Sequence, residues 1–205
     1  MTKQVAIEPL PRGRHGLTRE QVVQSQRARI FRAMAETMAE KGYVATSVAD
    51  VLRAAKVSRE TFYEQFDSKA DCFMSALEAA VDVVIAAAFD APPAGGTPLE
   101  RFDHGLRTYL DAVAARPELA RLFLIEVYAA GPAALERRAA VQRRFAEILG
   151  DTFGRRTASD RFANEAIVAA TSSMVTARLA AGDLDGLRAL RRPLVGLARR
   201  LHGDT

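Results

Sequence analysis

Helix-start signals recur along this chain, and apolar residues follow them at three- and four-residue spacing. Most starts combine an N-cap residue with a partner three positions on, or carry a proline in the first turn. The pattern predicts helices over residues 18–41, 47–55, 58–66, 68–91, 98–115, 117–129, 132–153, 159–181 and 184–201. No stretch shows sustained two-residue alternation. We therefore predict an all-α fold of about nine helices and no sheet.

The residues that carry chemistry in enzymes and metal sites are sparse. Cys72 has no second cysteine to pair with, and His15, His104 and His202 lie far apart in the sequence. No nucleophile motif or phosphate-binding glycine loop accompanies them. The apolar run Val83–Phe89 is too short to cross a membrane, and the N-terminus lacks a secretory signal. These features predict a cytoplasmic protein that is not an enzyme, needs no metal or cofactor and does not enter a membrane.

The net charge of +4 is unevenly distributed. Residues 1–69 carry the whole excess of basic side chains, whereas residues 70–205 are neutral. This asymmetry favours a basic module that faces a polyanion, joined to a neutral body; a solvated basic surface is the alternative. In the arm 1–17, Arg12 and Arg14 flank a glycine, a pattern that suits a narrow minor groove. A solvated basic tail explains this pattern equally well.

The segment SVADVLRAAKVSRETFYEQF, residues 47–66, has the dimensions of a helix-turn-helix. Its first helix has one apolar side, and Phe62 and Phe66 give the second helix a face that can be buried. The remaining positions of that second helix carry hydrogen-bonding side chains: Ser58, Arg59, Glu60, Thr61 and Tyr63. Such a helix can place its N-terminal residues against phosphates and base edges. A surface pair of helices in another kind of helical protein is the alternative.

The surrounding sequence, ARIFRAMAETMAEKGYVATSVADVLRAAKVSRETFYEQFDSKADCF, resembles the DNA-binding head of the tetracycline-repressor (TetR) family of bacterial regulators. The resemblance lies in the Gly42-Tyr43 stop, the start at residues 46–48, the "VS" before the second helix, "TFY" followed by Phe66, and the entry at residues 68–69. It implies a basic arm over 1–17, a helix-turn-helix DNA-binding domain over 18–67, and a ligand-binding and dimerisation domain over 68–205.

Carried over by position, the resemblance assigns Thr46 and Ser47 to phosphate contacts and residues 58–63 to the recognition helix. It makes Tyr63 and Lys69 further phosphate contacts. Lys56 departs from the family, which usually has glycine at this turn. Either Lys56 takes a right-handed turn geometry, or it tolerates a left-handed one at a cost of about 1 kcal/mol. In both cases it adds a charge beside the DNA backbone.

The C-terminal part carries features of a dimerisation surface. Leu187, Leu190, Leu194 and Leu197 follow the narrow apolar spacing of helices that pack lengthwise, and Pro193 either kinks this segment or starts a new helix. Small residues that allow close helix contact precede them: Ala166, Ala170, Ser173 and Ala177. The resemblance implies that these two segments form a four-helix bundle with a second copy. Packing within one chain is the alternative.

The resemblance also implies that the body binds an unknown small-molecule effector, with double-stranded DNA and a second copy as the other partners. Candidates for the pocket lining are Phe89, Phe102, Leu106, Tyr109, Phe123, Tyr128, Phe145 and Met174, each of which could equally be plain core. The expected function is a ligand-responsive repressor that binds a palindromic operator as a dimer. A helical interaction or scaffold protein without sequence-specific DNA binding is the alternative.

Overall fold

A computed structural model describes residues 18–90, 96–154 and 157–203, and within these ranges the chain forms helices and turns without a strand. The α-helices are α1 (Arg19–Ala45), α2 (Val48–Ala55), α3 (Arg59–Tyr63), α4 (Lys69–Ile85), α5 (Pro98–Ala115), α6 (Pro117–Leu124), α7 (Pro132–Phe153), α8 (Ala158–Ala181), α9 (Leu184–Ala189) and α10 (Arg191–His202). A π-helical turn, η1 (Ala86–Asp90), follows α4, and a 3₁₀ turn, η2 (Glu126–Ala130), follows α6. The predicted all-α fold is confirmed.

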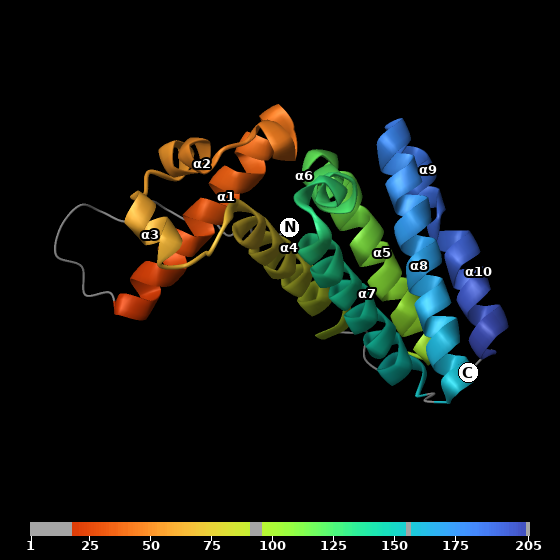
Figure 1. Cartoon of the computed structure of the whole chain (residues 1–205). Coiled ribbons are helices and arrows are strands. Elements are labelled where there is room, and N and C mark those ends of the chain that lie inside the picture. Colours follow the sequence, from red (N-terminus) through yellow and green to blue (C-terminus); the bar gives the residue numbers. More distant parts are fainter. Residues whose placement is uncertain (1–17, 91–95, 155–156, 204–205) are drawn as a thin grey trace.

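The helices form two parts that meet along α4. Figure 1 shows α1, α2 and α3 grouped at one end of the molecule, while α5, α7, α8 and α10 run side by side in a bundle at the other. Helix α4 begins beside the first group and extends into the bundle. Within the bundle, α7 packs against α8, and α5 packs against both α10 and α7. We call α1–α3 the head and α5–α10 the body.

The predicted helix starts agree with the observed ones to within a residue or two. Complete capping boxes open four of the helices, formed by Thr18 with Gln21, Ser47 with Asp50, Thr97 with Glu100, and Thr157 with Asp160. In each box the two side chains bind the backbone N–H groups that a helix start leaves without partners. Prolines occupy the first turn of α5, α6 and α7, where their missing N–H costs nothing.

Four predicted helices end earlier than expected, and those over 58–66 and 68–91 stop as α-helices at Tyr63 and Ile85. The helix expected over 117–129 stops at Leu124, and η2 continues the chain to Gly131, which has a φ of 93°. The helix expected over 184–201 is divided into α9 and α10 at Leu190, and Pro193 is the third residue of α10. A proline fits there because the first-turn N–H groups have no partner within the helix. Of the two alternatives for Pro193, the structure selects the start of a new helix.

Lys56 adopts the left-handed conformation, with φ 54° and ψ 49°, at the end of α2. It is the single non-glycine residue with positive φ in the described parts of the chain. Its own N–H and that of Val57 both donate to the carbonyl of Leu52, so the turn closes α2 in the usual way despite the side chain. Of the two conformations expected for Lys56, the structure therefore has the left-handed one, which is strained for a residue with a Cβ.

Two hydrophobic clusters hold the molecule together. The first contains the buried aromatic residues of the head together with Leu122, Val127 and Ala134 from the body. The second lies inside the body and includes Leu106, Leu179 and Leu194. Because the first cluster also contains Cys72, Phe73, Met74 and Leu77 of α4, the apolar core is continuous across the boundary predicted at residues 67–68.

One stretch, Lys69–Phe89, has the length and mean hydropathy, 1.9, of a membrane span. A core helix of a soluble protein can have the same length and composition. Its apolar residues contribute to the cluster shared by head and body, and the helix packs against α1, α5 and α7.

Arg137 of α7 joins the body to α4. Its Nε and Nη2 donate to the two carboxylate oxygens of Glu78 at 2.8 and 2.9 Å, and its Nη1 donates to Asp71 Oδ1 at 2.8 Å. These contacts raise the pKa of the guanidinium, chiefly through the hydrogen bond to Glu78. A guanidinium that binds two carboxylates in this forked geometry orients both helices.

Arg137→Gln should lower the free energy of unfolding by about 1–2 kcal/mol, because three charge-assisted hydrogen bonds at a half-buried site are lost. Arg144→Gln is the matched control on the same helix: Arg144 pairs with Asp82 at a more exposed site, where the loss should stay below about 1 kcal/mol. Urea unfolding followed by circular dichroism compares the two variants. Equal losses of unfolding free energy in the two variants would show that Arg137 stabilises the fold no more than Arg144 does.

Lys56→Gly should raise the free energy of unfolding by about 0.5–1 kcal/mol, because glycine removes the Cβ contact that strains a left-handed residue. Lys56→Ala keeps the Cβ and should change stability by less than about 0.5 kcal/mol. Unfolding curves of the two variants separate the effect of strain from that of the lost charge. A destabilised glycine variant would show that the turn is not strained.

Candidate nucleic-acid interface

The first turn of α3 points away from the molecule while its other face is buried. Ser58, Arg59 and Glu60 are exposed, and Tyr63 is 46% exposed. On the opposite side, Phe62 and Phe66 are 0% and 2% exposed, with their ring centroids 5.4 Å apart. The short helix, which lies at one end of the molecule (Figure 1), therefore depends on these two rings for its position. Its polar side chains are exposed.

Local hydrogen bonds define the outer face of α3. The backbone N–H of Thr61 donates to Ser58 Oγ at 3.0 Å, and the two hydroxyl oxygens lie 2.9 Å apart. The Arg59 guanidinium lies 5.9 Å from the centroid of the Tyr63 ring one turn further on. Ser58 and Thr61 thus begin the helix, while Arg59 and Tyr63 form its exposed ridge.

The start of α2 is fixed by a charged network. Ser47 Oγ accepts from the N–H of Asp50, and the Asp50 carboxylate accepts from Ser47, from Lys41 at 3.1 Å and from Arg53 at 3.2 Å. The hydrogen bonds from Ser47 and then that from Lys41 hold the pKa of Asp50 well below its usual range. The sequence analysis did not assign a role to Lys41 or Arg53. Both donate to the Asp50 carboxylate and balance its negative charge.

Two of the residues predicted to contact phosphates, Thr46 and Lys69, donate hydrogen bonds to backbone carbonyls of their own chain. The Thr46 side chain is 2% exposed, and its hydroxyl donates to the Gly42 carbonyl at 2.8 Å. Lys69 Nζ donates to the carbonyls of Tyr43 and Thr46, both at 2.8 Å, and lies 4.2 Å from the centroid of the Tyr43 ring. The Thr46 hydroxyl is thus used at the end of α1, and a phosphate contact by this residue stays a prediction. Burial lowers the pKa of Lys69.

The remaining residues that we predict to contact DNA are exposed or lie outside the described residues. Ser47 and Lys56 are exposed, at the start and the end of α2. Lys56 directly precedes the turn into α3, so its charge lies beside the exposed first turn. Arg12 and Arg14 lie outside the described residues.

The eight predicted pocket residues lie in different parts of the described structure. Phe102 and Leu106 are buried in the body cluster, whereas Phe123 stacks on Phe73 in the cluster shared with the head. Tyr128 and Met174 are 57% and 45% exposed. Tyr109 and Phe145 face each other with ring centroids 6.3 Å apart. Spacing along single helices could not show which faces turn toward a shared interior.

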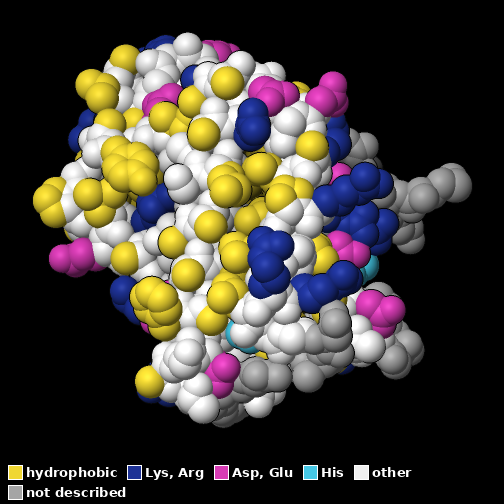
Figure 2. All heavy atoms as spheres, turned by 90° about the vertical axis from the view of Figure 1, so that its right-hand side faces the viewer, with side chains coloured by type: hydrophobic (Ala, Val, Ile, Leu, Met, Phe, Trp, Pro, Cys, Tyr) yellow, Lys and Arg dark blue, Asp and Glu magenta, His cyan; other side chains and the backbone are white. Residues whose placement is uncertain are grey.

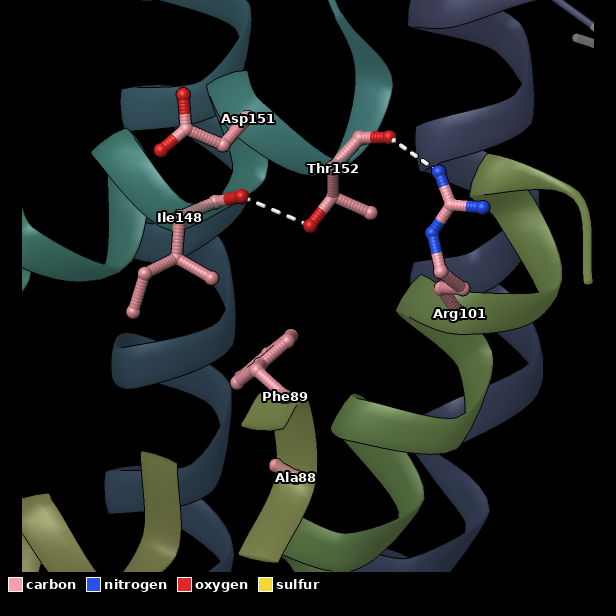
Figure 3. Close-up of a pocket in the computed structure, with 6 residues that line it drawn as sticks. All are labelled: Ala88, Phe89, Arg101, Ile148, Asp151 and Thr152. Carbon is pink, nitrogen blue, oxygen red and sulfur yellow. Dashed lines mark hydrogen bonds between the residues drawn. The ribbon is translucent and has the colours of Figure 1, made fainter. Parts of the chain in front are cut away.

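Phe89 borders a small hollow, of about 250 Å³, between η1, α5 and α7 (Figure 3). Its ring packs so close to Gly105 that a Cβ at residue 105 would lie 2.6 Å away. At the rim, Arg101 donates to the carbonyls of Gly96 and Thr152 at 2.6 and 3.0 Å. This arginine therefore connects α5 to the end of α7.

The predicted leucine seam belongs to the interior of the chain. Leu187, Leu190 and Leu194 are 0%, 6% and 1% exposed and pack in the body cluster, and Leu197 packs against that cluster from its edge. Placing the first three in an interface between copies was wrong, because α9 and α10 use them to cover α5 and α8. The small residues of α8 lie differently: Ser173 and Ala177 are exposed, and Ala166 and Ala170 are partly exposed.

Apolar side chains also gather on the face of α8 and α10. Figure 2 shows many hydrophobic atoms on the side of the molecule that carries these helices. The exposed apolar residues include Phe162, 73% exposed, Met174, 45%, and Leu201, 44%.

A further contact between head and body was missed by the sequence analysis. The backbone N–H of Tyr43 donates to the carboxylate of Glu126 in η2. Gly42, with φ 77°, turns the end of α1 toward this carboxylate. The two partners are 83 residues apart, so no spacing pattern could indicate the contact.

Comparisons with known proteins agree with this geometry. The family described as "Bacterial regulatory proteins, tetR family" has a sequence model that matches residues 30–76. The fatty acid degradation regulator FadR from Bacillus halodurans shares the fold, with a TM-score of 0.70 and 21% identity over 87% of this chain and 95% of that chain. No curated protein matches the sequence at a significant level.

Two further solved structures have the same architecture. FadR from Bacillus subtilis in complex with stearoyl-CoA gives a TM-score of 0.72 at 19% identity, over 87% of this chain and 99% of that chain. A putative TetR-family transcriptional regulator from Syntrophomonas wolfei gives 0.74 at 18% identity, over 89% and 97%. The matched segment 30–76 contains α2, α3 and the exposed polar turn, and the fold around it is the one these regulators share. Residues 30–76 therefore match the tetR family of bacterial regulatory proteins, and most of the chain has the fold of these solved structures.

Proposed function

We propose that this protein is a ligand-responsive transcriptional repressor, which binds a palindromic operator as a homodimer in the cytoplasm. The observation that carries this proposal is the exposed first turn of α3, held by two buried phenylalanines inside a matched tetR-family head. A helix in this setting can enter the major groove with its N-terminal residues at the base edges. Arg59 offers the guanidinium that suits guanine, and Ser58 and Tyr63 offer hydroxyl groups.

The short length of α3, the proposed recognition helix, favours dimerisation. One helix of five residues contacts about half of an operator, so a two-fold dimer is needed to read a palindrome. The exposed apolar face of α8 and α10, with Ser173 and Ala177 between the larger side chains, supports a second copy as its partner. Small residues on α8 would let two such helices approach closely.

A response to ligand requires a physical connection between the body and the head. Arg137 binds Asp71 and Glu78 on α4, and Glu126 binds the end of α1. An effector that favours another arrangement of α7 or η2 would shift α4 and the head with it, and so change the distance between the two recognition helices. Loss of operator binding on addition of effector is the expected direction.

A gel-shift titration of the full chain on the DNA flanking its own gene tests the proposal. Arg59→Ala should weaken specific binding roughly 5- to 150-fold, because a bidentate base contact contributes about 1–3 kcal/mol of discrimination. Lys56→Gln should weaken specific and non-specific binding alike and reduce the salt slope by about 1. Arg143→Ala, which removes an exposed charge from α7, serves as the control and should bind like the wild type.

The absence of any salt-sensitive, sequence-specific shift by the folded protein would refute the repressor proposal and favour a helical scaffold protein. If the Arg59→Ala variant bound the operator with wild-type affinity and still discriminated against random DNA, another surface would read the operator.

Ala177→Glu should convert the dimer to a monomer, because a charge on the exposed face of α8 would be buried between copies without a partner. Light scattering after gel filtration should give twice the 22.3 kDa chain mass for the wild type and a single chain mass for the variant. Ala140→Glu, on an exposed position of α7, is the control and should remain dimeric. A dimeric Ala177→Glu variant would place the interface elsewhere.

A further inference from the structure

Arg138 is a half-buried arginine without a carboxylate partner among the residues that the structure describes. Its Nη2 donates to Ser172 Oγ at 2.9 Å, and its guanidinium lies 5.2 Å from the centroid of the Tyr128 ring. The Nε atom of Arg138 is buried and has no hydrogen-bond acceptor within the described chain. Buried polar groups in native proteins nearly always have partners, and the described part of the chain does not supply one for this N–H.

The side chains around Arg138 carry more hydrogen-bond donors than acceptors. Ser172 Oγ accepts from both Arg138 and Gln142, the latter at 3.2 Å, which leaves the hydroxyl proton of Ser172 free to donate elsewhere. One turn further along α8, Thr176 Oγ1 is buried without a partner in the described residues. Arg138, Gln142 and Ser172 therefore meet with a surplus of N–H and O–H hydrogens, and the Thr176 hydroxyl follows one turn further along α8.

Tyr109 of α5 completes this cluster from the interior. Burial raises the pKa of Tyr109 to about 12, and the nearby positive charge of Arg138 opposes that shift. The phenol is therefore protonated at neutral pH and adds another possible donor. Phe145 lies against Tyr109 and follows Arg138 and Gln142 at helical spacing on α7, so an apolar surface adjoins the charged end.

We propose that Arg138, with Ser172 and Thr176, binds the carboxylate of a small organic acid whose apolar tail packs toward Tyr109 and Phe145. An ionised carboxylate has only acceptor atoms, and it matches the fork of a guanidinium together with two hydroxyl donors. A phosphate dianion would require more positive charge than the single guanidinium supplies. Tyr128, 57% exposed over the guanidinium, marks the side from which the ligand enters.

This assignment rests on the proposed ligand response and names the chemical class of the effector. Arg137, which holds α4 through Asp71 and Glu78, is the immediate neighbour of Arg138. A carboxylate bound at Arg138 acts on the same turn of α7 that orients α4. Binding that turns this part of α7 would therefore reach the head through the Arg137 contacts.

The test follows the thermal unfolding of the full chain, and binding by calorimetry, with sodium benzoate, octanoate, acetate and phosphate and with the neutral amides benzamide and octanamide, at constant ionic strength. Benzoate or octanoate should raise the unfolding temperature of the wild type by more than 2 °C, because a ligand that binds the folded state stabilises it. Acetate, which lacks the tail, should give a smaller shift. Benzamide, octanamide and phosphate should give none.

Arg138→Gln should weaken binding of the responsive carboxylate at least tenfold, whereas Arg143→Gln, a charge-matched change on the exposed side of α7, should bind it normally. Ser172→Ala should weaken binding by a smaller factor. If no carboxylate stabilises the wild type, or if Arg138→Gln responds as the wild type does, the proposal is wrong. A merely structural Arg138 would lower the unfolding temperature and leave the response intact.

Gel shifts with the same proteins separate this proposal from the proposed function. A specific shift that no carboxylate alters, together with an absent thermal response, overturns the carboxylate site and leaves the DNA-binding proposal standing. A thermal response that depends on Arg138 without any DNA shift supports the site and overturns the repressor proposal.

Discussion

The burial of two phenylalanines beneath α3 is the constraint on which the rest of the structure depends. A helix of five residues cannot hold its own shape in water, because forming its first turn costs more than so few hydrogen bonds return. Phe62 and Phe66 supply the missing stabilisation by packing into the cluster that also holds Phe73 and Leu122. The polar face of α3 is exposed because the opposite face is occupied.

That cluster also explains how the two parts of the molecule are connected. Leu122 and Val127 of the body pack with head residues, and polar contacts surround this shared core: Glu126 binds the end of α1, Lys69 binds two carbonyls nearby, and Arg137 binds α4. Apolar packing resists separation of head and body, while the directional polar contacts define their relative orientation. A change in the body that alters either set has a short physical route to α3.

Several residues have the predicted local pattern, but their tertiary contacts differ from the predicted ones. The leucines of α9 and α10 have the predicted spacing, yet they cover α5 and α8 in their own chain rather than a second copy. Thr46 stands at the predicted start of α2, yet its hydroxyl closes the end of α1. A periodic pattern shows that a helix has an apolar face, but it does not show which surface covers that face.

The sequence by itself determined the helical class, the capped and proline-marked starts, and the helix-turn-helix with Phe62 and Phe66 turned inward, because these features depend on neighbours within a few residues. It also limited Lys56 to two conformations. Only the tertiary structure decided between them, made one core of head and body, and brought Arg138 against Ser172, 34 residues away. The physical reason is the distance along the chain over which each effect acts. Helix caps and apolar periodicity depend on residues within a turn or two. Which surface covers a helix face, and where a charged side chain remains unpaired, depend on the packing of the whole chain.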